Sequence, residues 1–438
     1  MSEQQHTTTG KITKIINGRL LRNHEIVENS YIYIQDGKII DAFHSFFDEQ
    51  REPDHIIDAK GAIVSPGFID LQINGAFGID FSDYEGSEEK LAKDIAIVAN
   101  GLLQNGCTAF CPTVVTSAPE VYSKVLPLLR HRPGNAKTGA EILGAHCEGP
   151  FISTEKKGAH DQTVIQNAKD GIASLDKAYG PELRKGGETV RIMTVAPELE
   201  GMLDVIPQLI DRNITVSIGH SAATIDQAEA GVAAGATFMT HLFNAMRPFH
   251  QRDPGMVGIL GASDLPEPKQ PERHPLPSST SPDGNKPDPR PFYGVICDGV
   301  HVHPNSVRIA YYSHPRGCVL VTDALSAAGL PRGIYQLGGR DVEVRGVSGA
   351  YVKGTNTLAG STVTIDHCVR NFKKFTRCTA VEALEAATLH PAQALGIQAT
   401  KGTLNPGSDA DLVFLDDDLH IQKVFVRGEE VELKERHV

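Results

Sequence analysis

The stretch ITVSIGHSAATIDQAEAGVAAGATFMTHLFNAM (residues 214–246) predicts two strands joined by a helix. Its two ends, 214–221 and 238–246, are apolar runs that each finish in polar residues, as a strand buried on both faces should. The segment between them, 224–235, has apolar residues at helical spacing and ends in glycine. The stretch therefore predicts one strand–helix–strand unit of a parallel sheet.

The same kind of apolar run recurs along the chain, and helical segments separate most of the copies. The runs are FIDLQIN (68–74), CTAFCPTVV (107–115), ILGAHCEGP (142–150), VRIMTVAPE (190–198), ITVSIGHS (214–221), FMTHLFNAM (238–246), YGVICDGVH (293–301) and CVLVTDA (318–324). Eight parallel strands alternating with helices predict an α/β fold of the (β/α)8 TIM barrel type. In such a barrel the active site lies at the carboxyl ends of the strands.

Both ends of the chain differ from the barrel region. Residues 11–64 contain short alternating segments with an Asp36-Gly37 hairpin signal, and residues 401–438 alternate in the same way. Neither part has enough strands for a stable sheet alone. We expect one small β-sandwich domain built from both termini, with the catalytic barrel at 65–400 between them. The Pro-, Ser- and charge-rich segment 263–292 is expected to be a flexible insertion in that barrel.

Composition excludes several classes of protein. The net charge of −12 argues against broad nucleic-acid binding or an anionic membrane surface. No apolar run reaches the ~18 residues of a membrane helix. The seven cysteines contain no Cys-x-x-Cys pair and mostly lie in apolar runs, which favours a reduced, cytoplasmic compartment.

Three polar residues at predicted strand ends form a candidate metal site. A single histidine at a strand end is more often a hydrogen-bonded structural residue, but His220 and His241 end consecutive strands. Glu148 ends the third strand, where it could otherwise cap the following helix. Two imidazoles and a carboxylate leave one position open for water, as in catalytic zinc sites.

Asp323, at the end of the eighth strand, is the candidate acid/base. A carboxylate near a metal-activated water could take its proton and later protonate a leaving group, although Asp323 could also be a helix N-cap. His160 and His301 are expected on loops at the barrel mouth. His146 lies two residues before Glu148, either beside the metal or beneath it, and His303 precedes a proline and fits a structural role.

A set of motifs resembles the amidohydrolase superfamily. The motifs are PGFIDLQING (66–75), HCEGPF (146–151), KKGAH (156–160), GHSAAT (219–224), THLFNAM (240–246), CDGVHVHP (297–304), VTDA (321–324), TLAGS (357–361) and KGTLNPGSDADLVFLD (401–416). The resemblance runs from about Lys11 to Val431, leaving out 263–292. HCEGPF, THLFNAM and DGVHV in this order resemble the deacetylases of amino-sugar phosphates within that superfamily.

The resemblance implies a role for each matching residue. It implies metal ligation by Glu148, His220 and His241, and acid/base catalysis by Asp323. It implies sugar-phosphate binding by Asn244, Ala245, Arg252, His301, Ala159, His160, Leu358, Ala359 and Gly360. The implied reaction is hydrolysis of N-acetylglucosamine 6-phosphate to glucosamine 6-phosphate and acetate in amino-sugar catabolism. A homodimer is also implied, with Arg252 supplied across its interface.

One departure from the superfamily concerns the number of metals. Many members carry His-x-His after PGFID and bind two metals, whereas this chain has Gln72 and Asn74 at those positions. Neither residue is a usual ligand of a buried divalent cation. We therefore expect one divalent metal per chain, Zn²⁺ in the first instance, although the ligand set also suits Co²⁺ or Fe²⁺.

Two other functions fit the sequence less well. An amidohydrolase acting on a cyclic amide or an unphosphorylated N-acyl sugar would leave the Arg252 phosphate anchor unused. A catalytically inactive barrel kept for binding would be expected to lack metal ligands or the catalytic base. The three proposed ligands and the proposed base, Asp323, are all present.

Overall fold

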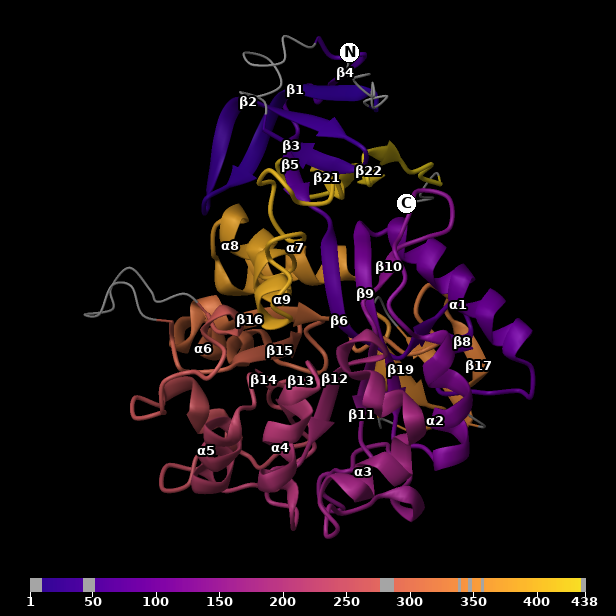
Figure 1. Cartoon of the computed structure of the whole chain (residues 1–438), viewed down its shortest axis with the longest axis vertical. Coiled ribbons are helices and arrows are strands. Elements are labelled where there is room, and N and C mark those ends of the chain that lie inside the picture. Colours follow the sequence, from indigo (N-terminus) through magenta and orange to yellow (C-terminus); the bar gives the residue numbers. More distant parts are fainter. Residues whose placement is uncertain are drawn as a thin grey trace, which may run out of the picture.

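The computed structural model describes residues 10–41, 52–275, 287–337, 340–345, 349–355 and 358–434. The extreme termini and residues 276–286, the middle of the predicted insertion, lie outside the described residues. A parallel barrel occupies most of the chain, and a smaller sheet covers one end of it (Figure 1). This arrangement confirms the predicted fold class.

The barrel strands coincide with the eight apolar runs. They are β6 (Phe68–Ile73), β9 (Cys107–Val115), β11 (Ala145–Glu148), β12 (Val190–Val195), β13 (Thr215–Ile218), β14 (Phe238–Met239), β15 (Phe292–Ile296) and β16 (Cys318–Val321). Each strand from β11 to β15 pairs in parallel with the next, and β9 links β6 to β11. Between β16 and β6 the barrel closes through an Ile73–Ala324 bridge, with backbone hydrogen bonds from Asp323 N to Gln72 O at 2.8 Å and from Asn74 N to Ala324 O at 2.7 Å.

Helices cover the outside of the barrel. They are α1 (Glu88–Leu103), α2 (Pro119–Val125), α3 (Ile172–Tyr179), α4 (Met202–Asp211), α5 (Ile225–Ala234), α6 (Pro304–Ser313), α7 (Ile365–Thr376), α8 (Ala380–Glu385) and α9 (Leu389–Ala394). Their buried apolar side chains and those of the strands form one continuous core. That core holds the strand ends at fixed positions around the mouth.

The two terminal segments come together, as predicted, and form one mixed sheet. Its strands are β1 (Ile12–Arg22), β2 (Glu25–Gln35), β3 (Lys38–Ile40), β4 (His55–Asp58), β5 (Ile63–Pro66), β21 (Leu412–Leu415), β22 (Ile421–Val426) and β23 (Glu429–Glu430). From β5 the chain enters the barrel at Gly67, where a Cβ would lie 2.0 Å from Thr108 Oγ1. Only glycine therefore allows this close crossing.

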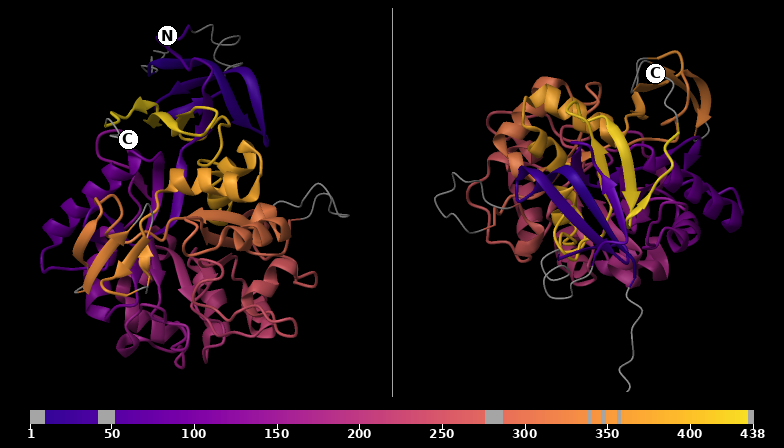
Figure 2. Two further views of the ribbon diagram at one scale, coloured as in Figure 1. Left: turned by 180° about the vertical axis from the view of Figure 1, so that it is seen from behind. Right: turned by 90° about the horizontal axis from the view of Figure 1, so that it is seen from above.

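Three small β elements were not predicted. A meander after the eighth barrel strand comprises β17 (Gly333–Leu337), β18 (Arg340–Arg345), β19 (Gly349–Val352) and β20 (Leu358–Ser361). Figure 2 shows it on the flank of the barrel, near the first helices. The others are the β7 (Gly75–Ala76)–β8 (Ile79–Asp80) hairpin and β10 (Glu141–Ile142), which pairs with β9.

Part of the predicted insertion packs against the barrel. Residues Pro271–Arg273 form a short 3-10 helix, and the Arg273 side chain is buried. Its guanidinium donates to Asn213 Oδ1 and, at 3.4 Å, to Thr215 Oγ1 at the start of β13.

No helix in the described ranges is long and apolar enough to cross a membrane.

Candidate active site

The three predicted metal ligands converge at the carboxyl ends of their strands. Glu148 is the last residue of β11, while His220 and His241 lie two residues beyond β13 and β14. Glu148 Oε1 is 3.2 Å from His220 Nε2 and 3.0 Å from His241 Nε2. The two Nε2 atoms are 3.0 Å apart. We call these three residues the mouth cluster.

Strained backbone turns direct these side chains inward. The φ angles are 46° at His220, 24° at His241 and 46° at Asp323, all in the left-handed region. Residues other than glycine rarely adopt this region, and such strain concentrates at functional sites. At each of these positions the strand ends in a turn, and the turn directs the side chain toward the barrel mouth.

The geometry of the mouth cluster fits a bound cation. His220 Nδ1 lies 2.9 Å from the Lys156 carbonyl oxygen and so donates to it. In the neutral ring Nε2 then carries a lone pair, which faces a carboxylate oxygen and would be repelled unless a cation lay between them. Tetrahedral ligands at ~2.0–2.2 Å from one zinc ion are roughly 3.3 Å apart, close to the three separations found here.

The electrostatics of Glu148 point the same way. Burial opposes its ionisation, but hydrogen bonds and charge from His220 and His241 hold its pKa well below its usual range. In turn, despite burial, Glu148 raises the pKa of His241 to about 9. This buried anion therefore needs a positive partner, which is a protonated His241 in the metal-free chain or a cation held by the same atoms.

Asp323 lies beside the mouth cluster, held by two amides. Asn74 Nδ2 donates to Asp323 Oδ1 at 2.8 Å, and Gln72 Nε2 donates to the same oxygen at 3.3 Å. Gln72 Nε2 also donates to Glu148 Oε1 at 2.8 Å, so one amide bridges the two carboxylates. Burial and the Glu148 charge raise the pKa of Asp323 to about 6. A pKa in this range suits a group that exchanges a proton near neutral pH.

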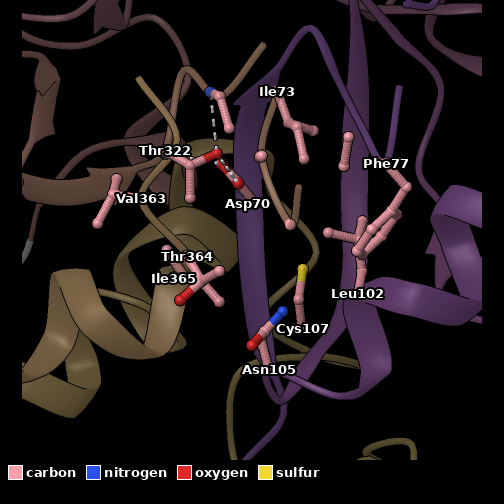
Figure 3. A pocket seen from close by; sticks show the side chains of 14 residues that line it. Asp70, Ile73, Phe77, Leu102, Asn105, Cys107, Thr322, Val363, Thr364 and Ile365 are labelled. Carbon is pink, nitrogen blue, oxygen red and sulfur yellow. Dashed lines mark hydrogen bonds between the residues drawn. The ribbon is translucent and has the colours of Figure 1, made fainter. Parts of the chain in front are cut away.

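A second buried carboxylate fixes the backbone of Asp323. Asp70 Oδ2 accepts a 2.5 Å hydrogen bond from Thr322 Oγ1, and Asp70 Oδ1 accepts from the Thr322 and Gln72 N–H groups at 3.2 Å (Figure 3). Burial raises the pKa of Asp70 to about 7. Beside it lies a cavity of about 30 Å³, room for one water molecule, which Ile73, Phe77 and Cys107 help to line (Figure 3). Asp70 therefore joins β6 to the end of β16 by side-chain hydrogen bonds, at a place where few backbone hydrogen bonds link the two strands.

His160 reaches the mouth cluster from the 153–160 loop. Its Nε2 is 3.9 Å from Glu148 Oε2, and its ring lies edge-on to that of His220. Ligand atoms of Glu148, His160 and His220 fall within 4.8 Å of one another, so His160 is an alternative third ligand by proximity. The shorter contacts of His241 favour His241 for that position.

Two other histidines have structural partners. His146 lies beneath the site, with Nδ1 2.9 Å from Leu71 O and Nε2 2.7 Å from Thr194 Oγ1. Of the two placements open from the sequence, this is the one beneath the mouth cluster. His303 caps α6, its side chain accepting from Asn305 N at 3.1 Å.

The predicted substrate residues surround this centre to different degrees. His301 is held by Asp298, whose Oδ2 is 2.6 Å from His301 Nδ1. Asn244 and Ala245 are half-buried directly after His241, and Ala159 is exposed beside His160. Leu358, Ala359 and Gly360 begin β20, although only the backbone of Ala359 is described. Arg252 lies outside the buried centre, exposed on the loop after β14.

Sequence reasoning missed the residues that hold the site residues in place. Glu198 accepts from Ser221 Oγ and Ala222 N, both at 2.7 Å, and so fixes the turn after His220. Thr116 contacts His160, and Asp298 contacts His301. Only Asp298 had a local signal, because its carboxylate also accepts from Val300 N and His301 N in a turn within CDGVH.

Comparison with known proteins gives consistent matches. The model of the amidohydrolase family matches residues 63–431. An N-acetylglucosamine-6-phosphate deacetylase of Danio rerio is 44% identical over 98% of this chain and 99% of its own length. The Homo sapiens protein of the same description is 45% identical over 98% of both chains. A variant of the Mycobacterium smegmatis deacetylase, solved with N-acetyl-D-glucosamine-6-phosphate, superposes with a TM-score of 0.74 at 29% identity, covering 97% of this chain and 100% of that one.

Proposed function

The chain belongs to the amidohydrolase family, and on that premise we propose that it hydrolyses N-acetylglucosamine 6-phosphate to glucosamine 6-phosphate and acetate. This makes it a deacetylase of amino-sugar catabolism. The observation that carries the proposal is the mouth cluster, with Asp323 held beside it by Gln72 and Asn74.

We assign the metal to Glu148, His220 and His241. A divalent cation bound there would supply Lewis-acid activation of the acetyl carbonyl and of water. We propose one ion per chain, since Gln72 and Asn74 offer Asp323 and Glu148 amide hydrogens where other superfamily members carry histidine ligands. Zn²⁺ is the proposed ion, because it favours two imidazoles and a carboxylate, a set also suited to Co²⁺ or Fe²⁺.

The chain's own residues move the proton. Asp323 takes a proton from the attacking water as the oxygen bonds to the acetyl carbon. The same proton passes to the amide nitrogen as the C–N bond breaks, releasing the amine and acetate. His160 would donate from Nε2 to the carbonyl oxygen as negative charge develops there.

Residues around the mouth would position the sugar phosphate. We assign the phosphate to Arg252 and His301, with Asn244 and Ala245, because a guanidinium and an imidazole suit a doubly charged anion. Ala159 would approach the acetyl group, and the Leu358–Gly360 segment the sugar. Arg252 is exposed in the single chain, which accords with a homodimer in which it serves the partner's site.

We also propose a cytoplasmic location. All seven cysteines are free, and six of them are buried, as suits a reducing compartment.

Acetate release by the purified protein tests the function. We expect release from N-acetylglucosamine 6-phosphate and at least ~100-fold less from unphosphorylated N-acetylglucosamine, because remote binding energy positions the amide. Arg252→Ala should reduce the ratio of the two rates by about tenfold or more, with Arg184→Ala, a change at another exposed arginine, as the control. Equal rates on both sugars would refute the phosphate assignment, and no release from either by the metal-loaded protein would refute the activity.

A further inference from the structure

We propose that Thr116 is a positioning residue that holds His160 as the neutral tautomer with its proton on Nε2. Thr116 directly follows β9, and His160 lies on the 153–160 loop, so a contact across 44 residues of sequence joins them. The proposal rests on the proposed function, in which His160 donates to the developing oxyanion. It also assigns a role to a side chain that the mechanism above does not use.

The direction of two hydrogen bonds carries the inference. The Thr116 backbone N lies 3.2 Å from His160 Nδ1, and Thr116 Oγ1 lies 2.7 Å from the same nitrogen. A backbone N–H can only donate, so Nδ1 must present its lone pair. The single remaining ring proton of the neutral imidazole is then on Nε2.

The opposite tautomer would leave an unfavourable contact. Thr116 Oγ1 is also 3.3 Å from the Glu148 carbonyl oxygen, so the hydroxyl could donate there and accept from a protonated Nδ1. The Thr116 N–H would then point at another N–H group. Thr116 is 5% exposed and His160 9%, so solvent offers little compensation.

The proton on Nε2 decides what His160 can do. That atom faces the mouth cluster, 3.9 Å from Glu148 Oε2. A protonated ring nitrogen has no lone pair for a cation, whereas it can donate to an oxyanion. Thr116 thus gives His160 a different role from His220 and His241. His160 can donate a hydrogen bond to the substrate carbonyl, whereas the Nε2 atoms of His220 and His241 remain available as ligands.

The proposal predicts the ring protonation of His160 in the zinc-loaded protein. Nitrogen-15 NMR should show His160 with a protonated Nε2 and an unprotonated Nδ1, the signal being assigned by its loss in His160→Gln. Thr116→Val keeps the shape and the backbone N–H but removes the hydroxyl, so His160 should keep its proton on Nε2 while the ring is held by one hydrogen bond instead of two. We expect kcat to fall about tenfold, less than the ~10²–10³ typical of losing an oxyanion donor outright, with KM and metal content unchanged.

Two further variants separate positioning from general packing. Thr116→Ser restores the hydroxyl and should recover kcat. Thr376→Val makes the same chemical change at a buried threonine in α7, whose hydroxyl bonds Phe372 O at 2.7 Å, and should leave kcat and the His160 tautomer unchanged.

Clear results would overturn the inference. A protonated Nδ1 in the unmodified protein would refute it, and so would a Thr116→Val variant with unchanged kcat. If the protein released no acetate, the proposed function would fail while the NMR result still decided the tautomer. If Thr116→Val failed to fold, the spectrum of the unmodified protein would remain decisive.

Discussion

Two groups of buried carboxylates lie at opposite ends of the barrel. At the end covered by the terminal sheet, Lys401 Nζ lies 2.8 Å from Glu141, 2.9 Å from Asp409 and 2.7 Å from Asp411. We call these four residues the lysine cluster. At the mouth, the ion pairs found for Glu148 among the described residues are with imidazoles alone.

The difference lies in where the positive charge comes from. In the lysine cluster the chain supplies its own ammonium, and the surrounding carboxylates raise the Lys401 pKa despite burial. In the mouth cluster the carboxylate faces imidazole nitrogens, which carry no charge when the rings are neutral, so the proposed positive charge is a cation from outside the chain. The first group therefore joins the terminal sheet to the barrel, and the second is the proposed cation site.

The largest effect is expected from removing the proton acceptor at the mouth. Asp323→Asn should lower kcat by up to about 10⁴-fold, because the amide cannot take the proton from water. Its carbonyl can still accept from Gln72 and Asn74, so the site should keep its shape. Steady-state kinetics and elemental analysis would measure activity and metal content in the same preparation.

Metal content is the control in that experiment. An unchanged ion-to-chain ratio with lost turnover assigns Asp323 to proton transfer. Loss of the ion would instead indicate that Asp323 is a metal ligand. The mouth cluster would then hold its cation with two carboxylates, and its contrast with the lysine cluster would have to be restated.

At the lysine cluster we expect a loss of stability instead. Lys401→Met leaves three carboxylates buried around an uncharged side chain and should lower the free energy of unfolding by about 3–5 kcal/mol. Lys423→Met is the matched control, since Lys423 pairs with Glu430 at 2.7 Å on the exposed surface and should cost less than about 1 kcal/mol. Urea unfolding would measure both.

The Lys401→Met variant should also keep its metal and its kcat when folded. Lost metal binding in a fully folded Lys401→Met protein would contradict the separation of the two clusters.

The sequence predicted the barrel because its determinants are local. Each buried strand is an apolar run, and Glu148, His220, His241 and Asp323 follow these runs directly. Parallel strands bring such residues to one face whatever the details of packing.

The missed features depend on contacts between distant segments. Thr116 meets His160 across 44 residues and Glu198 meets Ser221 across 23, and no spacing in the sequence marks either pair. The β17–β20 meander was missed because its strands, such as RDVEVR in β18, lack the apolar runs that mark the barrel strands. Lys401, Asp409 and Asp411 lie in one recognised motif, but Glu141 joins them from a distant segment of the chain.

Chelation should produce the smallest of these effects on stability and separates the two clusters most directly. Removing the ion should abolish acetate release and lower the free energy of unfolding by about 2.7 kcal/mol relative to protein with free metal at 100 times its Kd. The loss should be the same in Lys401→Met as in the unmodified protein, because the lysine cluster contains its own charge. In His241→Asn, which lacks one proposed ligand, chelation should change the unfolding free energy much less. If chelation left both the activity and the unfolding free energy of the unmodified protein unchanged, protons on the imidazoles would balance the negative charge of Glu148. That result would remove the contrast with the lysine cluster.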